Sequence, residues 1–157
     1  MLLPFFEWAY QTAIGETIRN STWLFPVIEA FHLVGFGIIG GAVVLVNLRL
    51  FGVGLSGQPV AKLSASVEPW FLGALALMFA SGIPLFLSEA TKAYYSFAFW
   101  VKMISLFLAL LFTFTIYRRL TRTNVTSASP LLVRSAAIIS LVLWFGVAWG
   151  GRWIGFS

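Results

Sequence analysis

Four long apolar stretches constrain this chain more than any other feature. They cover residues about 26–50, 69–87, 97–117 and 131–154. Each is close to the ~20 apolar residues that a helix needs to cross a bilayer. Only 10% of the residues are charged, against about 25% in a soluble domain. The sequence therefore excludes a soluble enzyme, a disordered chain and a nucleic-acid-binding domain, and it predicts an integral membrane protein.

The N-terminal segment is apolar but too often interrupted by polar residues to span a membrane. Its apolar positions from about residue 4 to 18 follow helical spacing, and Trp8 and Tyr10 are side chains typical of the membrane interface. We therefore predict an all-α fold: a polytopic four-helix transmembrane bundle with one short N-terminal interfacial helix. Residues 1–157 form a single transmembrane domain in this prediction.

The basic residues predict the orientation of the bundle. Loops one and three and the helix ends beside them hold six Lys or Arg residues, and the opposite side holds four. Because basic residues are enriched on the cytoplasmic side, both termini are expected outside the cytoplasm. The lipid bilayer is thus the first expected partner, and the net charge of +5 is assigned to orientation and not to nucleic acid.

Five ionisable residues lie inside the apolar stretches or at their edges, all toward the side of the termini: Glu29, His32, Glu89, Lys102 and Arg152. Glu29 and His32 are three residues apart and share a helix face. Intramembrane charges are costly and often functional, so we predict one polar site in which Glu29 lies within hydrogen-bond reach of His32, Lys102 or Arg152. The alternatives are a purely structural set of salt bridges and basic side chains that extend to the interface.

Asn47 and Arg49 lie at the opposite, cytoplasmic end of the first span. An arginine at this depth commonly contacts lipid headgroups. A local hydrogen-bonded pair between Asn47 and Arg49 is the alternative.

Two GxxxG motifs occur, one formed by Gly37 and Gly41 and the other by Gly146 and Gly150. Such motifs let membrane helices approach closely. The sequence leaves open whether each serves packing within the chain or association between chains.

The chemistry available to the chain is narrow. No catalytic motif is found, and one His, three Met and no Cys cannot complete a tight zinc or copper site. No cofactor is favoured, but a haem b needs only one or two axial ligands, so haem or metal on His32 stays open, with a second ligand from another subunit. No charged residue occupies the middle of a span, so a continuous path for an ion is not visible.

The order of several short motifs resembles a family of small, uncharacterised bacterial four-span membrane proteins, a domain of unknown function. Its pattern reads E-x-x-H, D-L-R-L-L-G, F-x-x-K and G-R-x-I, and this chain has E-A-F-H at 29–32, N-L-R-L-F-G at 47–52, F-W-V-K at 99–102 and G-R-W-I at 151–154. Asn47 replaces the Asp that the family usually has. A fainter likeness of residues 32–35 to the copper-resistance membrane protein family suggests metal or haem.

These observations favour a bacterial inner-membrane protein without catalytic activity and with periplasmic termini. It would act as a homo-oligomer or with other membrane subunits, and the polar site would face the periplasm. The alternative is a haem- or metal-binding electron-transfer protein that uses His32. A small-solute or ion transporter is the third interpretation.

Overall fold

Four helical segments are long and apolar enough to cross a membrane in the computed structural model, which describes residues 1–54, 57–122 and 128–156. They are α3 (Leu24–Leu50), α4 (Val60–Tyr95), the run from Phe97 to Arg122, and α7 (Pro130–Ile154). The third segment consists of α5 (Phe97–Phe112), a π-helical turn η1 (Thr113–Tyr117) and α6 (Arg118–Arg122). The described residues contain only helices and their connections, so the predicted all-α, four-span class is confirmed.

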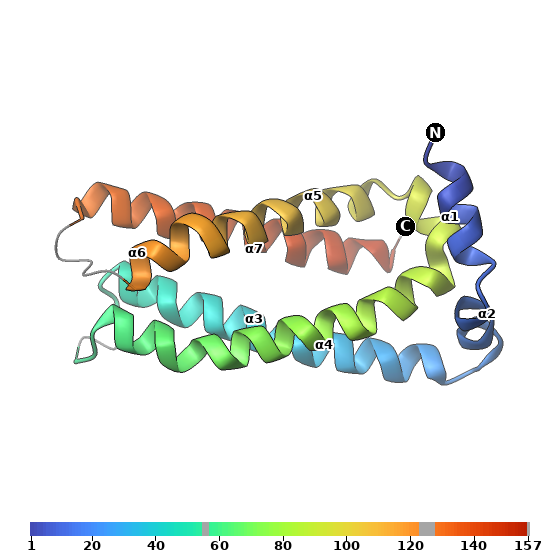
Figure 1. Ribbon diagram of the computed structural model, residues 1–157, viewed down its shortest axis with the longest axis horizontal. Coiled ribbons are helices and arrows are strands. Elements are labelled where there is room, and N and C mark those ends of the chain that lie inside the picture. The colour runs from blue at the N-terminus through green and yellow to red at the C-terminus, as the bar shows by residue number, and fades with distance from the viewer. Residues whose placement is uncertain (55–56, 123–127, 157) are drawn as a thin grey trace.

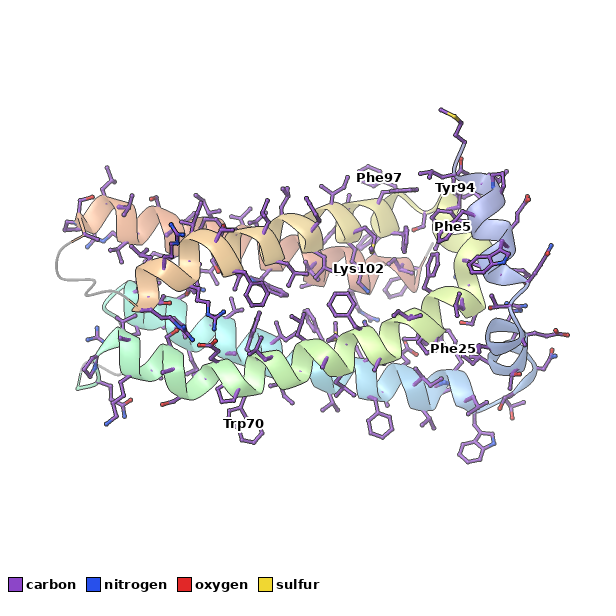
Figure 2. The ribbon with its side chains drawn as sticks, viewed as in Figure 1. Phe5, Phe25, Trp70, Tyr94, Phe97 and Lys102 are labelled. Atoms are coloured by element: carbon purple, nitrogen blue, oxygen red, sulfur yellow. The ribbon has the colours of Figure 1, made fainter. Side chains whose placement is uncertain are left out.

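The bundle consists of two helix pairs. Helix α3 packs along α4 and α5 packs along α7, while α4 makes few contacts with α5 (Figure 1). The N- and C-termini lie at the same end of the bundle, which we call the termini end; the opposite end is the loop end (Figure 1). Large apolar side chains such as Trp70 and Phe97 point away from the helices (Figure 2) and are 68% and 75% exposed, as expected of a lipid-facing surface.

An apolar layer closes the middle of the bundle. Its buried members come from all four spans and include Ile39, Phe71, Ala109 and Trp144. The rings of Phe71 and Trp144 meet edge to face, with centroids 5.7 Å apart. This layer separates the polar groups at one end of the bundle from those at the other.

Helix α4 is longer than the apolar stretch predicted at residues 69–87. It begins at Val60 and continues past residue 87 to Tyr95. Pro69 and Pro84 both lie inside the helix, and Glu89 has non-helical dihedral angles (φ −126°, ψ 24°) that produce a kink. Hydropathy detects only the lipid-buried part of a helix, so the polar extension at each end was missed.

The N-terminal segment is two helices and not the single helix predicted over about 4–18. Helix α1 covers Leu3–Tyr10 and α2 covers Ala13–Asn20. Thr12 breaks the segment because its extended backbone and its hydroxyl, which accepts from the Gly15 amide, form the N-cap of α2. Both helices lie across the termini end of the bundle (Figure 1), an arrangement that suits the membrane interface.

Arg19 attaches α2 to the kinked end of α4. Its guanidinium donates to the carbonyls of Tyr10 at 2.7 Å and Ser88 at 3.1 Å, and it lies 3.6 Å from the centre of the Tyr10 ring. Gly15 permits this approach, since a Cβ there would fall 2.4 Å from the Leu87 carbonyl oxygen. The N-terminal helices are therefore fixed to the bundle and not merely adsorbed on the lipid.

Candidate functional site

The best-defined polar contact at the termini end joins α3 to α4. His32 Nδ1 lies 2.9 Å from the Ser81 hydroxyl oxygen. Ser81 is buried and His32 is half-buried. Sequence reasoning missed Ser81, although a serine inside an apolar span is a signal that could have identified it.

The hydrogen bonds of Ser81 determine which ring nitrogen of His32 carries the proton. The Ser81 hydroxyl lies 2.7 Å from the Leu77 carbonyl, to which it donates its single proton. It must therefore accept from His32, so the imidazole carries its proton on Nδ1. In the neutral ring this leaves the lone pair of Nε2 free to accept a proton or bind a metal.

Glycines create the space for this contact. A Cβ on Gly82 would lie 3.1 Å from His32 Cε1, and a Cβ on Gly35 would lie 3.3 Å from the Ala74 carbonyl. The imidazole thus lies over a helix surface without a side chain. The close approach of α3 and α4 sets the rotation of α3 and directs His32 toward Ser81.

Lys102 of α5 is the charged group near His32. It is half-buried, lies between the helix pairs (Figure 2), and its charge acts on the imidazole. Its alkyl chain runs past Gly151, where a Cβ would lie 3.9 Å from the Lys102 Nζ. Within the described ranges, no hydrogen bond or ion pair to Lys102 Nζ is found.

The other three residues of the predicted site lie elsewhere. Glu29 is exposed and has no hydrogen bond or ion pair with any described residue. Glu89 pairs with Lys92 at 3.7 Å, and Arg152 is exposed, with its guanidinium carbon 4.7 Å from the Phe156 ring centre. The predicted five-residue network is therefore wrong: the packing of α3 turns His32 inward and leaves Glu29 outside.

Asn47 and Arg49 do not form a pair. Asn47 is buried and donates to the carbonyl of Val43 at 2.8 Å and to Ser140 at 3.3 Å. Arg49 instead donates to the carbonyl of Gln58 at 2.7 Å, across the first loop. The two side chains therefore make separate hydrogen bonds at the loop end of α3.

The two GxxxG motifs also differ. A Cβ on Gly146 would lie 2.5 Å from the Ser105 hydroxyl, and one on Gly150 would lie 2.8 Å from the Ala98 carbonyl, so this motif packs α7 onto α5. At Gly37 and Gly41 a Cβ would have no described neighbour within 4 Å. The motif at Gly146 and Gly150 is therefore intramolecular, and the motif at Gly37 and Gly41 remains available on the lipid-facing surface.

A second charged group, which the sequence analysis missed, lies at the loop end. The Glu68 carboxylate binds Arg118 and also accepts from Arg122 at 2.7 Å. The Glu68 side chain is only 20% exposed. It lies in the first turns of α4, before residue 69, where no span was predicted.

The donor set for a metal is small. No cluster of three or more His, Cys, Asp or Glu residues that could hold a metal ion occurs in the part of the chain that the structure describes. His32 is the one histidine of the sequence, and its Nε2 is the candidate haem or metal ligand predicted from the sequence.

The fold and the sites define a multi-pass membrane protein with separate polar groups at the two ends of a closed apolar layer. The chain belongs to the Family of unknown function (DUF6644), which matches residues 5–157. The curated proteins and the solved structures contain no match to it.

Proposed function

We propose that this protein is a non-catalytic protein of the bacterial inner membrane. In this proposal it acts as a homo-oligomer, and His32, Ser81 and Lys102 form a polar site on its periplasmic side. The site receives an acidic group, which a neighbouring subunit or a small anion supplies.

The surroundings of Lys102 support this proposal most directly. An ammonium group within the membrane is normally paired or extends to the interface. Lys102 is half-buried near His32, whereas the predicted acid Glu29 is exposed and Glu89 pairs with Lys92. An acidic partner from outside the described chain would complete the site.

The distribution of charge supports the orientation. Six of the ten basic residues lie toward the loop end, including Arg118 and Arg122, so this end is assigned to the cytoplasm. The His32 site then faces the periplasm together with both termini.

The outer face of α3 supports association between copies. Gly37, Gly41 and Val44 have the i, i+4, i+7 spacing of one helix face, and all three are exposed. Without a side chain at Gly37 or Gly41, the backbone of a second α3 can approach closely.

Replacement of Lys102 by methionine tests the proposed site. If Lys102 pairs with an acidic group from another subunit or a bound anion, Lys102→Met reduces the oligomer mass or the thermal stability of the protein in nanodiscs. Lys92→Met is the matched control, since Lys92 is exposed and pairs within its own helix. Equal behaviour of the two variants would contradict the proposal.

Haem binding through His32 is the second candidate. It is favoured by the Ser81 contact, which fixes the ring and leaves Nε2 free, as the outer hydrogen bond of a ligating histidine commonly does. The optical spectrum of the protein purified from haem-replete cells distinguishes the candidates. A Soret band that is lost in His32→Ala supports haem, and its absence in the wild type excludes this candidate.

A further inference from the structure

A small cavity lies inside the bundle near the loop end, apart from the His32 site. Its volume is about 70 Å³, and α3, α4, η1, α6 and α7 line it. Phe71 and Trp144 of the apolar layer close its inner side. Glu68 and Arg118, both partly exposed, also line it, as do Leu72 and Phe114, which are 41% and 39% exposed.

Several polar atoms of the cavity wall are buried without a hydrogen-bond partner. In the described residues these atoms are Thr113 Oγ1, Tyr117 OH and Arg118 Nε, and Asn47 Oδ1 is in the same condition beside Ser140. The Tyr117 hydroxyl faces Ser140 without reaching hydrogen-bond geometry. Buried polar groups normally have a hydrogen-bond partner, so four orphaned atoms in one region indicate a partner that the described residues do not provide.

The π-helical turn places two of these groups. A π-helix pairs residues i and i+5, so its winding is wider than that of an α-helix. Thr113 and Tyr117 begin and end this turn, and both line the cavity. Short π-helical segments occur frequently at functional sites, which agrees with the concentration of polar groups here.

We propose that this cavity is a hydration site that binds a cluster of water molecules and opens to the loop-end surface beside Glu68 and Arg118. One water needs about 10–15 Å³ of such volume, so the cavity of about 70 Å³ has room for about five to seven water molecules. Both donors and acceptors are orphaned, which suits water better than an ion of either sign. The site gives polar molecules access from the loop end as far as Trp144.

The absence of cysteine from the chain permits a direct test. Thr113→Cys places a thiol in the cavity wall and changes the side-chain volume little. Ile116→Cys is the matched control, because Ile116 belongs to the same turn but is 57% exposed on the outer surface. Both variants are reconstituted in nanodiscs and treated with 2-aminoethyl methanethiosulfonate, and modification is followed by intact mass.

A hydrated cavity predicts that Thr113→Cys reacts at least about tenfold faster than Ile116→Cys, because a thiol ionises readily only in contact with water. Equal rates, or no reaction at either position, would contradict the proposal. The melting temperature of Thr113→Val gives a second, independent result. It falls if the hydroxyl binds water and rises if the hydroxyl is orphaned in a dry cavity.

Discussion

His32 Nδ1 on α3 donates to the Ser81 hydroxyl on α4 at 2.9 Å, and this hydroxyl donates in turn to the Leu77 carbonyl oxygen at 2.7 Å. This chain of two hydrogen bonds fixes the tautomer of the imidazole and couples the two helices in the membrane. Interhelical hydrogen bonds of this kind contribute about 0.6–2 kcal/mol.

Ser81→Ala should therefore lower the free energy of unfolding by about 0.6–2 kcal/mol, because it leaves the His32 N–H without its acceptor. Chemical unfolding in detergent micelles measures the loss. Ser66→Ala is the control, since the Ser66 hydroxyl donates to the Lys62 carbonyl of its own helix and not to another helix among the described residues. A loss no larger than that of Ser66→Ala would show that the interhelical bond does not stabilise the fold.

Gly150→Ala should destabilise the α5–α7 pair by about 1–3 kcal/mol, as expected for an overpacked contact. The added Cβ would lie 2.8 Å from both the Ala98 carbonyl oxygen and Lys102 Cβ, and backbone atoms cannot move aside independently. Gly40→Ala is the control, since a Cβ there has no described neighbour within 4 Å. Thermal unfolding of the two variants compares them, and equal melting temperatures would refute the close packing.

Arg19→Gln should release the N-terminal helices from the bundle. The variant loses the hydrogen bonds to the Tyr10 and Ser88 carbonyls and the contact with the Tyr10 ring. Amide hydrogen exchange over residues 1–20 should accelerate while exchange in α7 stays constant. Arg134→Gln, a change at an exposed arginine of α7, should leave exchange over residues 1–20 unaffected. The same slow exchange in Arg19→Gln as in the wild type would be inconsistent with this attachment.

Glu68→Gln should lower stability more than Glu89→Gln. The former leaves Arg118 and Arg122 without their shared carboxylate, which is only 20% exposed. The latter breaks an exposed pair, worth about 0–1 kcal/mol. We expect an excess loss of about 1–3 kcal/mol for Glu68→Gln, measured by chemical unfolding at low and high salt. Equal losses would mean that the Glu68 ion pairs are as weak as surface pairs.

Hydropathy predicted the four spans well because lipid exposure requires long apolar runs. The starts of α3 and α7 differ from the predicted positions by only one or two residues. It failed at α4, where residues 60–68 are helical but alternate polar with apolar side chains, and at Thr12, where a single capping residue divides the N-terminal helix. These features depend on side-chain hydrogen bonds and contacts beyond the lipid core, which an apolar pattern does not contain.

The candidate site was predicted only in part, for a related reason. Helical spacing places Glu29 and His32 on adjacent positions of one face, but it does not give the rotation of that face toward the bundle. Contacts at Gly35 and Gly82 set the rotation, so His32 meets Ser81 and Glu29 stays outside. Charge alone identified Lys102, whereas Glu68 was missed because its helix was not recognised.

Disulfide cross-linking in native membranes tests the central claim, association through the outer face of α3. Val44→Cys places the only thiol of the chain on the face of Gly37 and Gly41, where Val44 is 46% exposed. Ile116→Cys, which is 57% exposed on another helix, is the control. With copper phenanthroline as oxidant, we predict a covalent dimer for Val44→Cys, its loss when Gly37→Leu is added, and none for Ile116→Cys. A monomer in every case, or equal dimer formation at both positions, would contradict the proposed homo-oligomer.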